Sequence, residues 1–402
     1  MKTYLDPKGG GPDGRRVAIT GIGVVASCGI GKDAYWEGLC RPGPVGTRRV
    51  EGFDPTQWFG PKEVRRVDRF AQFAVAAADM AFEDAGSPEY DPDRAGVLIG
   101  TGVGGLQTLE EQILVHHEKG ARRVSPFLVP MMMANAGAAT VSMRRGWRGP
   151  CETTVTACAA GTHAIGNAAR LVATGRCDVM VAGGSEAAIT DVSTAGFGNM
   201  TALSNEGISR PFDARRDGFV MAEGAACLIL EELEAARARG AHIYGEVVGS
   251  ASTADAHHIT APAPGGAGAA TCMELALADA GVSPSDVRHI NAHGTSTPLN
   301  DAAEAEAIIK LFGTPGPPVT STKGVTGHAL GAAGALEAVA LTLTIERGLI
   351  PPTSGYEEPD PAIPLDVVAG APRAWEPGPA LSNSFGFGGH NGCLVLVPPS
   401  DG

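Results

Sequence analysis

The stretch Thr153-Thr-Val-Thr-Ala-Cys158-Ala159 decides how the rest of this 402-residue chain is interpreted. Its β-branched residues favour an extended strand, and the small residues at 159–171 favour a helix. Cys158 is therefore expected on a sharp turn, where free N–H groups of the first helical turn point at the thiol. Because a helix N-terminus stabilises an anion, this arrangement predicts a nucleophilic thiolate. The alternative is a buried and inert cysteine, since a free cysteine packs like a small hydrophobic residue.

Two later segments carry histidines after apolar stretches. The first segment follows an apolar stretch and reads Asn291-Ala-His293-Gly-Thr-Ser-Thr297-Pro. The second also places a histidine after a short strand-like stretch, adds the cation Lys323, and reads Val319-Thr-Ser-Thr-Lys323-Gly-Val-Thr-Gly-His328. A glycine-rich run, Asn383-Ser-Phe385-Gly-Phe-Gly-Gly389-His-Asn-Gly392, then precedes a strand-like segment at 393–397. The chain thus offers a thiol, two imidazoles, an ammonium group and a flexible loop as candidate catalytic parts.

These four motifs occur in the order found in the elongating β-ketoacyl-acyl-carrier-protein synthases, which are ketosynthases of the thiolase fold. The chain resembles that family from about residue 16 to residue 397. The resemblance implies an α/β fold of two duplicated halves that form α-β-α-β-α layers. It places the nucleophile in an N-terminal half at 16–241, and both histidines and the glycine-rich loop in a C-terminal half at 242–402. Residues 1–15 are expected to be a flexible leader.

The residues alone support a layered α/β fold, because apolar strand-like runs alternate with alanine-rich helical runs. Strands are predicted at 16–25, 96–100, 178–183, 226–231, 242–250, 287–292, 319–322 and 392–398. Helices are predicted at 69–85, 158–174, 266–280, 301–312 and 331–347. Similar strands that open near Val17 and Tyr244 suggest a repeat of two halves.

Composition narrows the functional classes. A net charge of −13 argues against binding to nucleic acid or to an anionic membrane, which needs a positive field. No apolar run reaches the roughly 18 residues of a membrane helix, and the first residues lack the apolar core of a secretory signal. The eight cysteines form no CxxC pair, so no metal site is expected. We expect a cytoplasmic protein.

The family's reaction assigns a role to each catalytic candidate. By resemblance, Cys158 takes an acyl chain from a carrier thioester, and a malonyl thioester then decarboxylates and attacks that chain. His293 and His328 are expected to donate hydrogen bonds to the enolate oxygen. The backbone N–H groups of Cys158 and Phe385 are expected to form the oxyanion hole. Lys323 and Glu304 are expected to form an ion pair beside the histidines.

Other positions match the family's substrate contacts. The phosphopantetheine arm is expected to bind three threonine hydroxyls, those of Thr260, Thr295 and Thr297. The acyl tunnel is expected to be lined by Val103, Phe127, Leu128 and Phe197, with Phe385 as its gate. His258 is expected to approach the malonyl group.

The expected partner is an acyl carrier protein. Carrier proteins are acidic, so an acidic enzyme needs a local basic patch for docking. One candidate patch contains Lys62, Arg65 and Arg66, and a second contains Arg122 and Arg123. No cofactor is expected beyond the phosphopantetheine that the carrier brings. A homodimer is expected, because symmetric dimers are the commonest assembly.

Several alternatives bear on the function. A hydrolase would use one histidine base, and a degradative thiolase would carry a second cysteine in the last glycine-rich loop, where this chain has none. Initiating ketosynthases resemble a Cys-His-Asn pattern, whereas position 328 is histidine. A non-catalytic partner subunit would lack the nucleophile, so Cys158 argues against it. The catalytic subunit of a type II polyketide synthase, paired with a separate chain-length subunit, remains open beside fatty-acid elongation.

Overall fold

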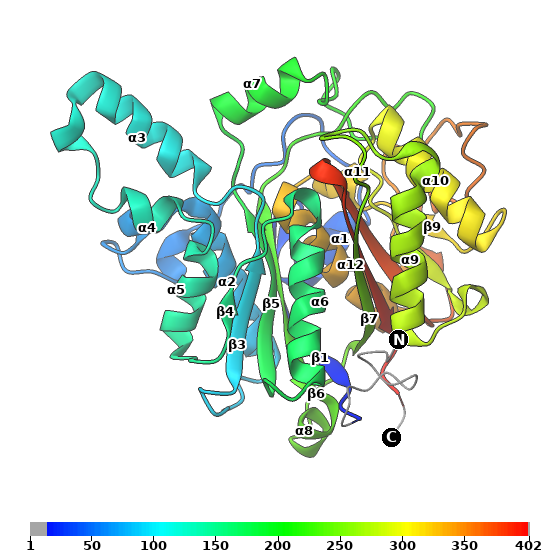
Figure 1. Cartoon of the computed structure of the whole chain (residues 1–402), viewed down its shortest axis with the longest axis horizontal. Coiled ribbons are helices and arrows are strands. Elements are labelled where there is room, and N and C mark those ends of the chain that lie inside the picture. The colour runs from blue at the N-terminus through cyan, green and yellow to red at the C-terminus, as the bar shows by residue number, and fades with distance from the viewer. Residues whose placement is uncertain (1–13, 401–402) are drawn as a thin grey trace.

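The computed structural model describes residues 14–400, so the predicted leader lies outside the described residues except for Gly14 and Arg15. Its centre is a mixed sheet of 11 strands within that range (Figure 1). In spatial order, the strands that form the path of the sheet are β4 (Cys151–Glu152), β3 (Ala95–Gly100), β5 (Val179–Glu186), β6 (Gly224–Glu232), β1 (Val17–Ala26), β7 (Gly245–Ala254), β13 (His390–Val397), β12 (Ala380–Gly386), β8 (His289–Asn291) and β9 (Val319–Thr320). The remaining strand, β2 (Gly29–Ile30), pairs with β1.

The two halves of this sheet repeat one plan. From the central β1–β7 pair outwards, β1, β6, β5, β3 and β4 correspond to β7, β13, β12, β8 and β9. In each half the inner pairings are antiparallel, and the outer ones, β5–β3–β4 and β12–β8–β9, are parallel. The predicted duplication is therefore confirmed. The division proposed between residues 241 and 242 falls in the loop between α8 (Leu233–Ala238) and β7.

Two helices form the middle layer between the halves. Helix α6 (Ala160–Ala173) and helix α12 (Ala333–Arg347) contact each other and strands of both halves. Residues 333–345 of α12 are buried on every side, as expected of a helix enclosed by other elements. The outer layers are α2 (Arg69–Asp84) with α5 (Ala136–Arg145) on one half, and α9 (Ala267–Ala280) with α10 (Pro298–Phe312) on the other (Figure 1).

Glycine allows the two central helices to approach closely. A Cβ on Gly161 of α6 would lie 2.8 Å from the backbone N of Ala335 on α12, and one on Gly334 would lie 2.0 Å from Oγ1 of Thr162. Both distances are far inside van der Waals contact, so any side chain at either position would push the helices apart. This contact fixes how the two halves meet.

The remaining elements surround this core. They are α1 (Lys32–Leu39), α3 (Leu106–Lys119), α4 (Leu128–Met132), α7 (Asp191–Asn199), α11 (Lys323–Thr326), β10 (Leu349–Ile350) and β11 (Arg373–Ala374), together with short 3₁₀ turns. The strand expected to run into Cys158 is shorter than predicted, because only Cys151–Glu152 pairs with a neighbour. Strand β12 extends into the predicted glycine-rich loop as far as Gly386. Among the described helices, none combines the length and the apolar character that crossing a bilayer requires.

Candidate active site

The candidate nucleophile lies on a strained turn at the start of α6. Cys158 belongs to the 3₁₀ turn Ala157–Ala159, and its side chain is buried. Ala157 has a φ of 49°, in the left-handed region that a residue with a Cβ rarely adopts. Such strain is retained where the surrounding structure enforces it. The predicted sharp turn is thus present, although a loop rather than a paired strand leads into it.

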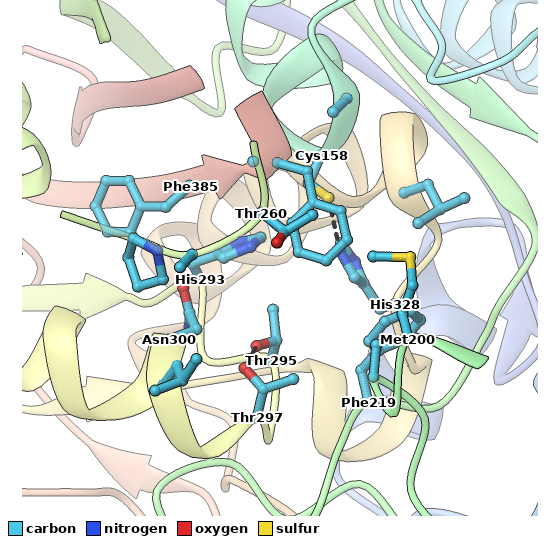
Figure 2. Close-up of a pocket in the computed structure, with 18 of the residues that line it drawn as sticks. Cys158, Met200, Phe219, Thr260, His293, Thr295, Thr297, Asn300, His328 and Phe385 are labelled. Carbon is cyan, nitrogen blue, oxygen red and sulfur yellow. Dashed lines mark hydrogen bonds between the residues drawn. The ribbon is translucent and has the colours of Figure 1, made fainter. Parts of the chain in front are cut away.

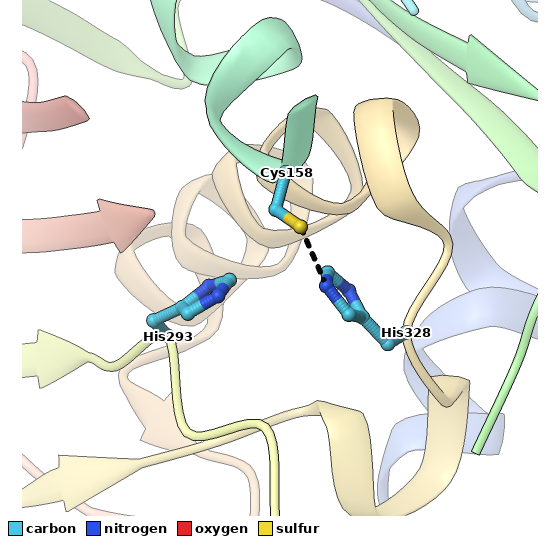
Figure 3. Close-up of side chains that lie close together, drawn as sticks. All are labelled: Cys158, His293 and His328. Atoms are coloured by element: carbon cyan, nitrogen blue, oxygen red, sulfur yellow. Dashed lines mark hydrogen bonds between the residues drawn. The ribbon is translucent and has the colours of Figure 1, made fainter. Parts of the chain in front are cut away.

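The two predicted histidines lie beside this thiol. His293 directly follows β8, and His328 follows α11, so both come from the C-terminal half. Nε2 of His328 lies 3.0 Å from Sγ of Cys158. The two imidazole centroids are 5.4 Å apart, and both rings are directed toward the thiol (Figure 3). The structure therefore brings together the three groups that the sequence singles out.

The predicted ion pair between Lys323 and Glu304 is wrong. Lys323 instead pairs with Glu337, a carboxylate on the enclosed helix α12, and its Nζ lies 2.5 Å from the backbone O of His293. Glu304 accepts the backbone N–H groups of His293 and Gly294 at 2.8 and 2.7 Å. The two buried carboxylates thus have separate roles. Glu337 neutralises the lysine, and Glu304 fixes the backbone that carries His293.

Burial and the charge of Lys323 together determine the protonation of the two histidines. Burial lowers the pKa of both His293 and His328 well below the usual value, and the positive charge of Lys323 lowers each further. Both rings are therefore neutral. Lys323 Nζ lies 3.3 Å from Nδ1 of His293, so this nitrogen accepts from the ammonium group and the ring proton resides on Nε2. His293 consequently presents an N–H donor to the thiol.

The thiol, His293 and His328 also meet the spacing of a metal site, because their ligand atoms lie within 4.8 Å of one another. A metal ligand must offer a bare nitrogen. The proton on Nε2 of His293 and the nearby Lys323 charge suit hydrogen-bond donation better than metal ligation.

The resting thiol is not the thiolate that the sequence predicted. Burial raises the pKa of Cys158 to about 11, although a backbone N–H of Phe387 and the charge of Lys323 oppose this shift. A helix N-terminus stabilises an anion by only about 0.3–1 kcal/mol, so desolvation outweighs it. Cys158 is thus protonated at neutral pH, and its proton has to move when it attacks a substrate.

The glycine-rich loop brings a further backbone N–H close to Cys158. The N–H that acts on the sulfur of Cys158 belongs to Phe387, two residues beyond Phe385. A Cβ at Gly386 would lie 3.0 Å from the backbone N of Cys158, so the loop crosses directly over the start of α6. Phe385 places its ring 6.1 Å from that of His293. The oxyanion donor at Phe385 stays a prediction, and Phe387 is a second candidate in the same loop.

A largely apolar cavity of about 430 Å³ opens above these groups (Figure 2). Six of the predicted substrate-contacting residues line it: Val103, Phe197, Thr260, Thr295, Thr297 and Phe385. The hydroxyls of Thr295 and Thr297 lie 2.9 Å apart on one wall. The structure adds wall residues that the sequence analysis missed, namely Met200, Phe219, Asp255, Leu330 and Phe387. Phe219 packs edge-on against His328, with ring centroids 5.3 Å apart.

Three predicted contacts do not line this cavity of the described chain, namely Phe127, Leu128 and His258. Leu128 begins α4, and Phe127 directly precedes it. His258 is exposed, and its Nδ1 accepts the backbone N–H groups of Thr260 and Ala261 at 3.1 Å each. These bonds hold the turn that carries Thr260.

The five basic docking candidates are all exposed. Within the described residues, none of Lys62, Arg65, Arg66, Arg122 and Arg123 forms an ion pair, so their charges are available to a partner. The Arg66 guanidinium lies over the Phe127 ring at 4.7 Å. This contact joins the 62–66 segment to the segment that follows Arg122 and Arg123.

Glu337 and Glu186 are buried carboxylates that the sequence analysis missed. A usable signal existed for Glu337, because it is the only charged residue in the otherwise uncharged segment 333–345. No comparable signal marked Glu186, which ends the buried strand β5.

Comparison with known proteins gives matches over both halves. Residues 41–236 match the family model for the beta-ketoacyl synthase N-terminal domain, and residues 244–357 match the model for its C-terminal domain. The chain is 49% identical to the 3-oxoacyl-acyl-carrier-protein synthase 2 of Synechocystis, covering 95% of this chain and 98% of that protein.

Solved structures of ketosynthases also match nearly the whole chain. One is an ishigamide ketosynthase/chain length factor, with a TM-score of 0.90 and 35% identity over 96% of this chain and 100% of that one. Another is a type II polyketide ketosynthase in complex with its acyl-carrier protein, with a TM-score of 0.88 and 34% identity, again over 96% and 100% of the two chains.

The raised pKa of Cys158 predicts how its alkylation depends on pH. Only the thiolate reacts, so the rate at Cys158 should rise about tenfold per pH unit from pH 7 to 10, since its pKa is about 11. Iodoacetamide labelling followed by peptide mass spectrometry measures this rate. A rate that levels off below pH 8 would mean that the helix N-terminus overrides burial.

Proposed function

The chain belongs to the beta-ketoacyl synthase family, and we propose that it elongates carrier-bound fatty acyl chains by decarboxylative condensation. One observation carries this proposal: a buried cysteine and two neutral histidines meet at the base of an apolar pocket. The pocket suits an acyl chain, and the three polar groups suit thioester exchange and enolate stabilisation.

In the first stage, the acyl chain moves from the carrier to the enzyme. The sulfur of Cys158 attacks the thioester carbonyl, and His328, 3.0 Å away at Nε2, relays the thiol proton to the departing carrier sulfur. The carbonyl oxygen becomes an oxyanion, held by the backbone N–H groups of Cys158 and of Phe385 or Phe387. The carrier thiol leaves, and the acyl chain remains on Cys158 as a new thioester.

In the second stage, malonyl-carrier occupies the same pocket. Its carboxylate leaves as carbon dioxide, and the electron pair of the broken C–C bond forms an enolate. His293 stabilises the enolate oxygen as an N–H donor through Nε2, and His328 adds a second N–H donor once its single ring proton has moved from Nδ1 to Nε2. The enolate carbon attacks the acyl carbonyl, and Cys158 departs as thiolate, which leaves a 3-oxoacyl chain on the carrier.

The remaining wall residues suit the carrier's arm. Thr260, Thr295 and Thr297 present hydroxyls along one route into the cavity, and an amide-bearing phosphopantetheine arm offers matching donors and acceptors. In this scheme the chain's own residues and the arm supply every group that the reaction needs, so the enzyme works without a resident cofactor.

The exposed basic residues suit docking of an acidic carrier protein. Lys62, Arg65 and Arg66 lie in one segment, and the Arg66–Phe127 contact links it to Arg122 and Arg123. A polyketide ketosynthase of similar structure is known in complex with its acyl-carrier protein, which supports such a partner here.

We favour a homodimer that makes fatty acids over a polyketide heterodimer. The 49% identity to a 3-oxoacyl-acyl-carrier-protein synthase 2 exceeds the 35% identity to the ishigamide ketosynthase/chain length factor. Strand β4 is an edge strand that pairs only with β3, and Val155 beyond it is 51% exposed. An unpaired edge of this kind can pair with a second copy.

The cysteines bear on where the protein acts. All eight are free thiols, which suits the reducing cytoplasm.

The two stages can be separated by mutation. His293→Ala should lower malonyl decarboxylation about 100- to 1,000-fold, because it removes one enolate donor, while acyl transfer to Cys158 persists. Cys158→Gln should still decarboxylate malonyl-carrier but form no 3-oxoacyl product. Carbon dioxide release and mass spectrometry of the acyl-enzyme give the two rates. Full condensation by His293→Ala would contradict the assignment.

Charge reversal tests the docking patch. Arg65→Glu with Arg66→Glu should raise the KM for carrier-borne substrate about tenfold, since exposed pairs each contribute up to about 1 kcal/mol. The KM for a small thioester mimic should not change, and the difference should shrink with added salt. Arg176→Glu, at an exposed arginine in the turn between α6 and β5, is the control for a charge reversal away from the patch. Equal effects on both substrates would place docking elsewhere.

Assembly and product are tested together. The protein purified alone should condense saturated acyl-carrier with malonyl-carrier, and light scattering should give the mass of two copies. If elongation begins only after a second, cysteine-less subunit is added, the polyketide alternative replaces this proposal.

A further inference from the structure

The ends of β5 and β12 each reach across to the central helix of the opposite half. Strand β12 leads to Gly386, which lies over the backbone N of Cys158 at the start of α6. Strand β5 ends at Glu186, which accepts the backbone N–H of Gly331 at the start of α12, at 3.0 Å. The duplicated halves thus make reciprocal contacts at the two helix starts.

The two helix starts have the same backbone form. Ala157, before Cys158, has a φ of 49°, and Leu330, before Gly331, has a φ of 45°. Each of these residues opens a 3₁₀ turn, and the turns lead into α6 and α12. Gly331 is therefore the structural counterpart of Cys158. The start of α6 opens into the pocket, whereas a carboxylate closes the start of α12.

Glu186 also binds the loop that follows β3. It is fully buried, and it accepts the N–H of Gly102 at 2.6 Å and the hydroxyl of Thr101 at 3.0 Å. The Thr101 hydroxyl in turn accepts the N–H of Gly104 at 3.2 Å. One carboxylate therefore ties the 101–104 loop of the N-terminal half to the start of α12 in the C-terminal half.

Both tied segments form walls of the pocket. Gly102, Val103 and Leu330 all line it. A Cβ at Gly102 would lie 3.6 Å from Cβ of Leu330, so the two segments adjoin in one part of the wall. Leu330 also packs in one apolar cluster with Cys158 and Ala188. A shift of either segment would move the wall next to the acylated sulfur. His293 is held independently by Glu304 and Lys323, which do not contact Glu186.

We propose that Glu186 is a positioning residue that holds the two adjoining segments of the acyl-pocket wall in register with Cys158. This inference rests on the proposed function, because it assigns to that wall the acyl chain delivered to Cys158. Glu186 then governs acyl loading and the choice of chain length, while the enolate donor His293, which Glu304 and Lys323 hold, keeps its geometry. Burial raises the pKa of Glu186 to about 7, which marks how costly this buried carboxyl is as an anion.

The test compares two substitutions of similar size. Glu186→Met removes every acceptor, and acyl transfer to Cys158 should fall about 10- to 100-fold, the order expected when a reacting group is misplaced. Chain-length selectivity should also change, whereas malonyl decarboxylation should fall much less, because His293 keeps its position. Glu186→Gln keeps one acceptor oxygen for the two N–H groups and an amide for Thr101, so it should recover most of the lost acyl transfer.

Three further measurements make the outcome decisive. Glu231→Met removes another buried carboxylate, on β6, and should lower the melting temperature without separating the two rates. Thr101→Val removes one hydroxyl contact and should shift acyl transfer in the same direction but less, which keeps the test valid if Glu186→Met does not fold. Unchanged acyl transfer and chain-length selectivity in a folded Glu186→Met protein, or equal loss of both rates, would overturn the proposal. Failure of the unmodified enzyme to accept any acyl chain would instead overturn the proposed function.

Discussion

The close contact between α6 and α12 is the constraint on which the whole site depends. Gly161 and Gly334 leave no side chain at the crossing, so the two helix starts lie close together between the halves. This distance puts Cys158, from one half, within hydrogen-bonding reach of His328, from the other. A larger residue at either glycine would separate the nucleophile from its histidines before it disturbed either half alone, because each half has its own outer layer of helices.

Buried charge then sets the chemistry of the site. Lys323 is enclosed with Glu337, and a paired buried ion avoids the large penalty of an isolated one. Burial lowers the pKa of His293, the same ammonium group lowers it further, and the contact of this group with Nδ1 fixes which nitrogen carries the proton. Lys323 therefore acts on the reaction through the imidazole of His293. Its carboxylate partner, Glu337, lies on the otherwise apolar buried part of α12.

Much of this could be predicted from the sequence, since local patterns marked the nucleophile, both histidines and most strands. The errors have a common physical origin in contacts between distant residues. The partner of Lys323 depended on which of two buried glutamates the fold brought close, and the charge state of Cys158 depended on burial that no local pattern reveals. The candidate oxyanion donor at Phe387 was missed because β12 runs farther into the glycine-rich segment than its composition suggested. Leu128 does not line the cavity of the single described chain, because its helix lies outside that lining.

The duplicated architecture contains two equivalent helix starts but one reaction centre. At the second start a glycine stands at the position of the nucleophile, and the carboxylate of Glu186 accepts the N–H of this glycine. Duplication of the scaffold has therefore not duplicated the nucleophile. The second helix start makes a structural contact between the halves, whereas the first presents a reactive side chain to the cavity.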